Sequence, residues 1–341
     1  MGIGINGMGR IGRLVLRRLA SDSKLMESMP VKAINMSYPA ETIAHLLKYD
    51  SVQGRWDAEI EAGNNSITIN GHEIAITSER DPERIPWASL GVRVVAEATG
   101  AFTKRDGMAK HLKGGAEKVV LTAPGTDLDL TVVMGVNDRV YDPAKHHLIS
   151  TASCTTNCIS PVLYVLDNAF GIETGMITSV HAYTSDQRHL DNPHRDLRRA
   201  RSCGQSIVPT TTGMGKALKE VIPHLSQCIH GLSLRIPTPD VSVADMSLTL
   251  KREVSTAEVK DAFLASPMIN HIIGWSDKPL VSVDYIGDSH SAVIDGLSLA
   301  AFGKQLKVLA WYDNEWGYAC RVVDMIERVG SELPVMAKGA I

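Results

Sequence analysis

Cys154 and His181 are the residues in this chain best suited to do chemistry, and each stands at the end of a predicted element. Cys154 follows one strand and opens a helix, where the amide dipoles stabilise a thiolate. His181 ends the strand Met176–Val180 and supplies a base for that thiol. Free cysteines are usually small buried hydrophobes, but the polar neighbours of Cys154 are poor core material. The pair therefore predicts nucleophilic catalysis.

A metal site is the alternative for the cysteines. Cys154 and Cys158 lie one helical turn apart, but Cys203, Cys228 and Cys320 are isolated, and no second ligand pair has zinc spacing. Five cysteines in a long chain indicate no disulfide framework and fit a reducing compartment. We expect a catalytic thiol, no metal and a cytoplasmic location.

The second motif with chemical meaning is the glycine-rich segment Gly7–Gly12, which reads GMGRIG. It follows a predicted strand at Ile3–Asn6 and opens an amphipathic helix, and the next predicted strand is Val31–Asn35. In such a βαβ unit the glycines let the backbone approach a pyrophosphate, and the helix N-terminus offers amides to it. The segment predicts a dinucleotide site.

The acidic residue that would select NAD is missing from this unit. An Asp or Glu is expected at the end of the second strand, where it binds the ribose 2′-hydroxyl. The chain has Asn35, Met36 and Ser37 there instead. Met36 does not repel a 2′-phosphate, the Ser37 hydroxyl can donate to one, and Arg80 can approach the adenine side. We therefore expect NADP to be preferred over NAD.

The pattern of predicted elements differs between the two halves of the chain. Up to Thr151 strands alternate with helices, and Asn70-Gly71 predicts a hairpin turn. In this half we expect further strands at Val92–Thr99, Lys118–Thr122 and Leu148–Ala152, with helices at Glu41–Lys48 and Lys104–Lys113. After Gly175 the strands alternate in polarity, and Ser255 with Glu258 forms a capping box. There we expect strands at Val241–Leu250, Leu280–Tyr285, Ser291–Leu299 and Leu306–Tyr312, with helices at Thr256–Leu264 and Asn314–Val329.

The predicted fold class is therefore α/β, with a doubly wound Rossmann nucleotide-binding domain over residues 1–151. An α+β catalytic domain with a mostly antiparallel sheet follows over residues 152–314. A C-terminal helix, about residues 315–341, is expected to pack back on the first domain.

Composition restricts the class of protein. The 341 residues carry 35 Lys and Arg against 38 Asp and Glu, and 44% are hydrophobic, which excludes a disordered chain and a globally basic nucleic-acid binder. No apolar run approaches the roughly 18–20 residues that span a bilayer. Arg195–Arg201 holds four arginines but no interleaved aromatics, so nucleic acid is not the expected partner and no membrane is expected either.

Several motifs together resemble phosphorylating glyceraldehyde-3-phosphate dehydrogenase over almost the whole chain. They are ASCTTNC at 152–158, HAYT at 181–184, DLRRAR at 196–201, TTTG at 210–213 and WYDNEWGY at 311–318. The resemblance implies reversible oxidation of D-glyceraldehyde 3-phosphate to 1,3-bisphosphoglycerate. It implies a hemithioacetal and then a thioester on Cys154, hydride transfer to NAD(P), and attack by inorganic phosphate. It also implies a homotetramer.

The resemblance also assigns roles to individual residues. His181 is the base, Thr184 and Arg235 bind the substrate phosphate, and Thr155 belongs to the substrate- and phosphate-binding set. The residues implied for the attacking phosphate are Ser153, Arg199, Thr212 and Gly213. The residues implied for the cofactor are Asn6, Gly7, Gly9, Arg10, Ile11, Met36, Ser37, Arg80, Thr99, Gly100, Thr122, Asn192 and Asn314, with Asn314 holding the carboxamide.

Two departures from the family pattern bear on the cofactor. Met36 stands where the family usually has an aspartate, and Asn192 stands where NAD-specific members usually have leucine. Both resemble the NADP-preferring, biosynthetic bacterial branch. The alternatives are erythrose-4-phosphate dehydrogenase, which Tyr183-Thr184 and Thr210–Thr212 resemble less, and a non-catalytic adhesin or RNA-binding regulator, which an intact Cys154–His181 pair disfavours.

Overall fold

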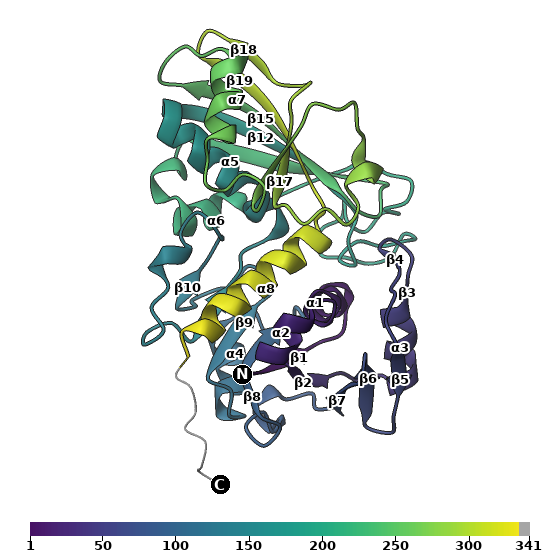
Figure 1. Cartoon of the computed structure of the whole chain (residues 1–341). Helices are drawn as coiled ribbons and strands as arrows, with labels where there is room; N and C mark the ends of the chain where they lie inside the picture. Colours follow the sequence, from purple (N-terminus) through teal and green to yellow (C-terminus); the bar gives the residue numbers. More distant parts are fainter. Residues whose placement is uncertain (334–341) are drawn as a thin grey trace. The chain divides into compact units, whose positions relative to one another are not determined.

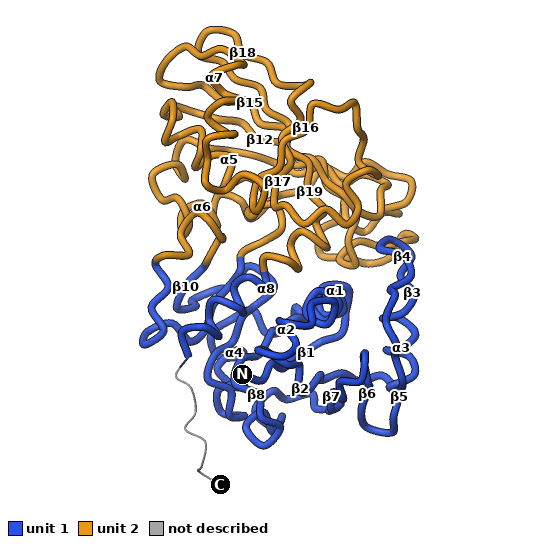
Figure 2. The backbone as a smooth tube through the Cα atoms, in the orientation of Figure 1, with its two compact units in different colours: residues 1–131, 140–151, 322–341 blue, residues 132–139, 152–321 orange. Residues whose placement is uncertain are grey.

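Two large β-sheets organise the computed structural model of the protein, which describes residues 1–333 (Figure 1). Unit 1 comprises Met1–Thr131, Val140–Thr151 and the residues from Val322 onward, and unit 2 comprises Val132–Arg139 and Ala152–Arg321 (Figure 2). Each sheet belongs to one unit.

The sheet of unit 1 has nine strands in the order β10-β11-β9-β8-β1-β2-β7-β6-β5. Its strands are β1 (Gly2–Asn6), β2 (Val31–Asn35), β5 (Ile60–Ala62), β6 (Ser66–Ile69), β7 (His72–Thr77), β8 (Val92–Glu97), β9 (Lys118–Leu121), β10 (Leu130–Thr131) and β11 (Leu148–Ser150). The helices wholly within this unit are α1 (Arg10–Ala20), α2 (Ser23–Ser28), α3 (Ala40–Lys48) and α4 (Arg105–Lys113), and β3 (Tyr49–Asp50) pairs with β4 (Gly54–Arg55).

The parallel part of this sheet has the doubly wound arrangement that the sequence predicts. β1 pairs in parallel with β2 on one side and with β8 on the other, so the chain reverses its winding direction beside β1. Every residue of β1 and β9 is buried, as parallel strands covered on both faces require. The predicted hairpin is also confirmed, since Asn70 and Gly71 both have positive φ (49° and 81°) between β6 and β7.

Unit 2 contains a sheet in the order β13-β14-β12-β15-β19-β17-β16, with β18 paired to β19. Its strands are β12 (Ile172–Ala182), β13 (Val208–Thr210), β14 (Ile229–Ile236), β15 (Ser242–Leu250), β16 (Ile273–Ser276), β17 (Ala292–Asp295), β18 (Ala300–Phe302) and β19 (Gln305–Tyr312). Its helices are α5 (Cys154–Phe170), α6 (Met214–Val221) and α7 (Thr256–Leu264). Only β12–β14 and β16–β17 are parallel among the pairings described, so the prediction of a mostly antiparallel sheet is confirmed.

The core of unit 2 explains why α5 is held firmly. Val162 and Leu166 on α5 are fully buried in one apolar cluster with Met246 of β15 and Val308 of β19. Burying an aliphatic side chain contributes about 1.5–3 kcal/mol. The first turn of α5 is therefore fixed relative to the strands of the sheet.

Two predictions about local structure need correction. Leu280–Tyr285 is not a strand, because Ser282–Tyr285 is a 3₁₀ turn in which the Asp284 carboxylate accepts a hydrogen bond from the Val281 amide (2.9 Å). The C-terminal helix, α8 (Trp316–Ser331), ends before residue 341. Residues 334–341 of that prediction lie outside the described residues. The capping box of α7 is confirmed, since Glu258 N donates to Ser255 Oγ at 3.2 Å and Ser255 N donates to the Glu258 carboxylate at 2.9 Å.

Candidate active site

The chain turns sharply as it enters α5, and this turn presents Cys154. Ala152 has φ of 56°, in the left-handed region that a residue with a side chain rarely adopts, and it is fully buried. Its carbonyl accepts a hydrogen bond from the Tyr318 hydroxyl at 2.9 Å. Ser153 then caps the helix, its Oγ accepting from Thr156 N at 3.1 Å. Cys154 consequently occupies the first helical position, as the sequence predicts.

The His181 imidazole faces the Cys154 thiol. Cys154 Sγ lies 3.4 Å from His181 Nε2, and His181 Nδ1 lies 2.6 Å from the carbonyl oxygen of Ala182. Two groups lie next to Nδ1: this carbonyl oxygen, which only accepts, and the Arg235 Nη1 atom at 3.1 Å, which only donates. The carbonyl oxygen is the nearer of the two, and Arg235 Nη1 also has Ala182 O as an acceptor at 3.1 Å, so we place the hydrogen of a neutral imidazole on Nδ1. Nε2 therefore directs its lone pair at the thiol, which is the arrangement that a general base needs.

Arg235 supplies the nearest positive charge. It pairs with His181 across the parallel β12–β14 ladder, and its Nη1 donates to Ala182 O at 3.1 Å and to Thr184 Oγ1 at 3.5 Å. The structure thus brings together Cys154, His181, Thr184 and Arg235, four residues that lie on three separate segments of the sequence.

Burial decides the protonation of this cluster. Burial raises the pKa of the Cys154 thiol, although the Arg235 charge and the amide and hydroxyl of Thr155 act to lower it. Burial, with the Arg235 charge, lowers the pKa of His181 to about 3. Burial thus favours the neutral form of both the Cys154 thiol and the His181 imidazole. Burial raises the pKa of Cys158 much further, so Cys154 is the more acidic of the two thiols.

Tyr312 belongs to the site, although the sequence did not single it out for this. Its hydroxyl lies 3.0 Å from both Thr155 Oγ1 and Ser179 Oγ. Its ring meets the His181 ring edge to face, with centroids 6.0 Å apart. The Thr155 hydroxyl therefore faces the protein interior. The WYDNEWGY motif was the available signal for Tyr312, but it could not show which side chains Tyr312 meets.

The residues expected for the attacking phosphate lie on three segments. Arg199 Nε donates to Thr210 Oγ1 at 3.0 Å, and its guanidinium pairs with the exposed Asp186. Thr212 accepts from the Met214 amide at 3.3 Å, and Gly213 is the N-cap of α6. Thr212 also lines a hollow of about 430 Å³ with Thr210, Thr211, Asp196, Arg198, Pro209, Gly231 and Leu232. Two of the four expected residues, Thr212 and Gly213, thus lie at the start of one helix.

The glycine loop of unit 1 has the geometry of a phosphate cradle. Gly7 has φ of 94°, and a Cβ on Gly12 would lie 2.0 Å from the Gly7 carbonyl oxygen, so glycine is required at both positions. A Cβ on Gly9 would meet nothing within 4 Å, so the backbone there is open to a ligand. Gly9 caps α1 without any side-chain bond to the first amides. These features fit a bound pyrophosphate.

A hydrogen-bond network centred on the buried Glu97 joins the strand ends beside this loop, and the sequence did not reveal it. Asn6 Nδ2 donates to Glu97 Oε2 at 2.6 Å, and the Thr99 amide donates to Glu97 Oε1 at 2.8 Å. His111 Nε2 lies 2.9 Å from Glu97 Oε2, and Trp87 Nε1 donates to His111 Nδ1 at 3.0 Å. We call Trp87, His111, Glu97, Asn6 and Thr99 the Glu97 network. It fixes the ends of β1 and β8.

At the end of β2 the side chains differ in whether they are engaged within the protein or exposed to a ligand. Asn35 Nδ2 donates to Asn6 Oδ1 at 2.7 Å, and Asn35 Oδ1 accepts from Thr77 Oγ1 and from the Glu79 amide, both at 2.9 Å. Met36 is buried, whereas Ser37 is exposed. Asn35 Nδ2 also donates to the Glu79 carbonyl oxygen at 2.8 Å, so the backbone of the exposed Arg80, the next residue in the chain, starts beside the end of β2.

The other expected cofactor residues differ in exposure. Thr99, Gly100 and Asn192 are exposed, and Ile11 and Thr122 are partly buried. Arg10 forms a two-pronged ion pair with Asp50 (2.8 and 3.0 Å). Asn314 is buried in unit 2, and its Oδ1 accepts from Ser242 Oγ at 2.6 Å.

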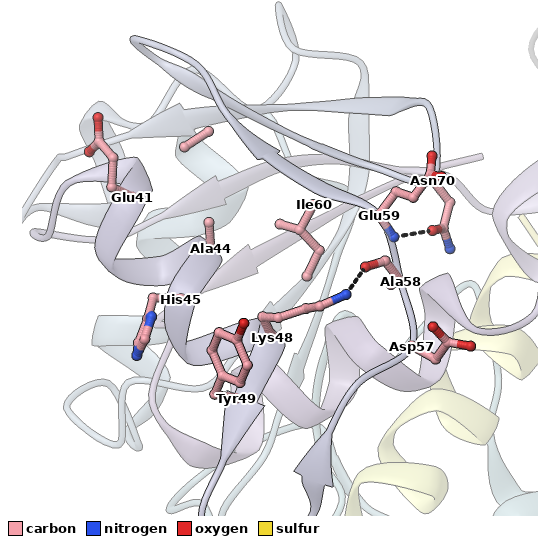
Figure 3. Close-up of a pocket in the computed structure, with 11 residues that line it drawn as sticks. Glu41, Ala44, His45, Lys48, Tyr49, Asp57, Ala58, Glu59, Ile60 and Asn70 are labelled. Carbon is pink, nitrogen blue, oxygen red and sulfur yellow. Dashed lines mark hydrogen bonds between the residues drawn. The ribbon is translucent and has the colours of Figure 1, made fainter.

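A separate hollow of about 730 Å³ lies between α3 and the β5 region of unit 1 (Figure 3). Lys48 Nζ crosses it to donate to the Ala58 carbonyl at 2.6 Å. None of the residues expected to bind the cofactor lines it. This hollow is therefore distinct from the glycine-loop site.

Two features are absent from residues 1–333. Within this range no helix has the length and apolarity to cross a bilayer. In the same residues no group of three or more His, Cys, Asp or Glu side chains is arranged to hold a metal ion.

Comparisons with known proteins agree on one family. The family model "Glyceraldehyde 3-phosphate dehydrogenase, NAD binding domain" matches residues 1–105, and the corresponding C-terminal domain model matches residues 153–314. Glyceraldehyde-3-phosphate dehydrogenase 2 of Bacillus subtilis (strain 168) is 52% identical over 334 residues, 97% of each chain. The glyceraldehyde-3-phosphate dehydrogenase of Geobacillus stearothermophilus is 50% identical over 333 residues, 97% of this chain and 98% of that one.

Proposed function

The chain belongs to the glyceraldehyde-3-phosphate dehydrogenase family, and from this we propose how its residues perform the reaction. It oxidises D-glyceraldehyde 3-phosphate to 1,3-bisphosphoglycerate, reversibly, with NAD(P) and inorganic phosphate. The observation that carries the proposal is the 3.4 Å approach of Cys154 Sγ to His181 Nε2 at the start of α5.

Cys154 and His181 carry out the covalent steps. The sulfur bonds to the aldehyde carbon while Nε2 takes the thiol proton and returns it to the carbonyl oxygen, which gives a hemithioacetal. Nε2 then removes that hydroxyl proton as a thioester forms. The bound nicotinamide supplies the hydride acceptor for this oxidation. Phosphate attacks the thioester carbon, and the released Cys154 sulfur recovers a proton from His181.

We assign the substrate phosphate to Arg235 with Thr184, and the attacking phosphate to Arg199, Ser153, Thr212 and Gly213. Guanidinium groups, hydroxyls and amides are the donors that such anions need. The contact between Arg235 and Thr184 supports the first assignment. Arg199 is paired with Asp186, so phosphate must compete with that carboxylate.

The preferred cofactor in our proposal is NADP. The support is the absence of an acidic side chain at the end of β2, together with the exposed Ser37 and Arg80. Asn192, where NAD-specific members usually have leucine, adds to this inference. Replacing Met36 with Asp should place a carboxylate beside the ribose and lower the NADP-to-NAD ratio of kcat/KM by about tenfold or more, while Met36→Leu should leave the ratio unchanged.

Three further assignments rest on the resemblance. We propose that residues 1–151 bind the cofactor, that residues 152–314 carry catalysis, and that the chain acts as a cytoplasmic homotetramer. Sedimentation velocity of the purified protein tests the tetramer, since a monomer at micromolar concentration would contradict it.

The decisive experiment measures reduced nicotinamide formed from glyceraldehyde 3-phosphate, with NAD and NADP in parallel and with or without phosphate. We expect phosphate-dependent turnover that is faster with NADP. Faster turnover with NAD would keep the reaction and remove the cofactor preference. Activity with erythrose 4-phosphate alone would assign the chain to the sister enzyme, and turnover by Cys154→Ala would remove the proposed nucleophile.

A further inference from the structure

Two buried carboxyl groups meet in unit 2 beside the proposed site, and the reaction above uses neither. Asp240 precedes β15 and is 2% exposed, and Asp313 follows β19 and is 1% exposed. The antiparallel ladder pairs Ser242 with Tyr312, which brings the two flanking carboxyl groups together. Val241, which joins Asp240 to the start of β15, has φ of 62°, a strained value for a β-branched residue.

The amides around Asp313 show which carboxyl group is ionised. Asp313 Oδ1 accepts from the amides of Glu315 (2.9 Å) and Trp316 (2.7 Å), and its Oδ2 accepts from the amide of Gly287 (2.8 Å). Three N–H donors favour a carboxylate. Asp240 is hydrogen bonded to Asp313, and two adjacent buried carboxylates repel each other strongly. The proton therefore resides on Asp240.

The charges around Asp240 agree with this assignment. Burial, with the negative charges of Asp313 and Glu315, raises the pKa of Asp240 to about 9. The loop that contributes Gly287 also carries Asp288 and His290, which bond to each other at 2.7 Å. From α5, Cys154 faces the same region, and an ionised Asp240 would raise the pKa of the Cys154 thiol.

Asp240 is linked to the proposed site through its neighbours in the chain. Ser242 Oγ donates to Asn314 Oδ1 at 2.6 Å and accepts from the amide of Ala182, next to His181, at 3.0 Å. Asn314 directly follows Asp313. A shift at the carboxyl pair would therefore move the expected carboxamide-binding residue and the end of β12 together.

We propose that Asp240 is a positioning residue that works as a neutral carboxylic acid, donating a hydrogen bond to Asp313 and so holding Asn314 and Ser242 in place. In the same neutral form it keeps a negative charge away from the Cys154 sulfur. The inference rests on the proposed function for the roles of Cys154 and Asn314.

Asp240→Asn tests the proposal, because an amide donates to Asp313 as the acid does but never ionises. At pH 7 we expect kcat/KM within about twofold of the wild type. The wild type should lose activity as pH rises through about 9, and the variant should lack that loss. Asp240→Ala, which removes the donor, should lower kcat/KM by about tenfold at pH 7.

Two measurements that need no turnover separate this proposal from the proposed function. Iodoacetamide should alkylate Cys154 with a lower apparent pKa in Asp240→Asn than in the wild type. A raised folded pKa means that wild-type stability is full below the unfolded value and is lost as pH rises towards 9. The thermal midpoint of Asp240→Asn should therefore exceed that of the wild type by more at pH 8.5 than at pH 5.

The outcomes that overturn the proposal are definite. Superimposable pH profiles for Asp240→Asn and the wild type would show that Asp240 does not titrate. A loss in Asp240→Asn equal to that in Asp240→Ala would show that the site needs a carboxylate. A wild type inactive on every aldehyde tested would contradict the proposed function, while alkylation and unfolding would still decide the protonation of Asp240.

Discussion

Glu97, at the end of β8 in unit 1, accepts hydrogen bonds on both carboxylate oxygens from partners in its own unit. Cys154, at the start of α5 in unit 2, is only partly buried, and its sulfur faces a neutral imidazole. The Glu97 network satisfies its polar groups internally and so stiffens the strand ends beside the glycine loop. Burial around Cys154 favours the neutral thiol and the neutral His181 imidazole, so the imidazole can accept the thiol proton when a substrate binds.

The backbone shows the same contrast. The glycine loop relieves its positive φ at Gly7 with glycine, whereas Ala152 holds a positive φ with a side chain attached. Such a residue costs about 1–3 kcal/mol and persists only where its surroundings hold it. Unit 2 supplies that hold through the buried α5 and the Tyr318 hydroxyl. The proposed phosphate-binding loop thus has relaxed backbone geometry, whereas the turn before the proposed nucleophile has strained geometry.

Among the variants that test this comparison of the two units, the largest effect is expected from removing the proposed nucleophile. Cys154→Ala should lower kcat by about 10⁴-fold or more, because no other group near His181 forms the thioester. Phosphate-dependent formation of reduced nicotinamide measures this. Cys158→Ala is the matched control one helical turn away, and it should retain activity, since its thiol is fully buried. Equal losses in the two variants would contradict the assignment of Cys154.

Removing the base should have the next largest effect. His181→Asn should lower kcat by about 10²–10⁴-fold, the usual contribution of a general base. Because the pKa of His181 is lowered to about 3, iodoacetamide alkylation of wild-type Cys154 should show no inflection near pH 6.5. An inflection there that disappears in His181→Asn would mean that the imidazole is charged in the resting protein.

The lowered pKa of His181 also predicts how the stability of the folded protein depends on pH. A folded pKa below the unfolded value of about 6.5 means that wild-type stability is lost as pH falls from about 6.5 towards 3. His181→Asn should reduce this acid sensitivity in thermal unfolding. An unchanged acid sensitivity would assign it to other groups.

Glu97→Gln should destabilise unit 1 while leaving the Cys154–His181 pair of unit 2 in place. An amide nitrogen would face the donors of Asn6, His111 or Thr99, so we expect a loss of about 2–4 kcal/mol in the free energy of unfolding. Urea unfolding measures it. Glu83→Gln, which breaks only the exposed pair with Lys113 (3.2 Å), should cost about 0–1 kcal/mol. Similar losses in the free energy of unfolding for both variants would contradict a stabilising role for the Glu97 network.

The smallest effect is expected at Asp50, at the edge of the same unit. Although burial acts to raise it, the Arg10 guanidinium and the amides of Gln53 and Val52 lower the pKa of Asp50 to about 2. This stability is present above pH 4 and is lost as pH falls towards 2. Asp50→Asn should therefore cost about 1–2 kcal/mol at pH 6 and nothing near pH 2. A cost independent of pH would contradict the ion pair.

Much of the fold was predictable because its signals are local. The glycine loop, the Asn70-Gly71 turn and the Ser255–Glu258 capping box each depend on residues within a few positions of one another. The prediction of a strand at Leu280–Tyr285 was wrong because a side-chain hydrogen bond, which a hydrophobic pattern does not show, decides the local structure there. Its apolar residues resemble a strand, but the Asp284 carboxylate closes a turn onto Val281, and hydrophobic pattern alone does not reveal that bond.

The candidate site was predictable in part. Cys154 at a helix start and His181 at a strand end follow from sequence pattern, and the resemblance named Arg235 and Thr184. The roles of Tyr312, Glu97 and Asp240 did not follow, because each depends on what its side chain meets. A carboxyl in the sequence does not show whether it will be buried, and burial decides its charge.

The sequence by itself determined most of the order of elements, the glycine-rich loop after β1, the place of the proposed nucleophile at a helix start and the lack of an acidic residue after β2. These depend on backbone preferences and on side chains close together in the chain. Only the tertiary structure decided the hydrogen on His181 Nδ1, the proton on Asp240, and the bond between Asn6 and Glu97, which are 91 residues apart. Those properties depend on burial and on partners brought together by strand pairing, and no local pattern specifies them.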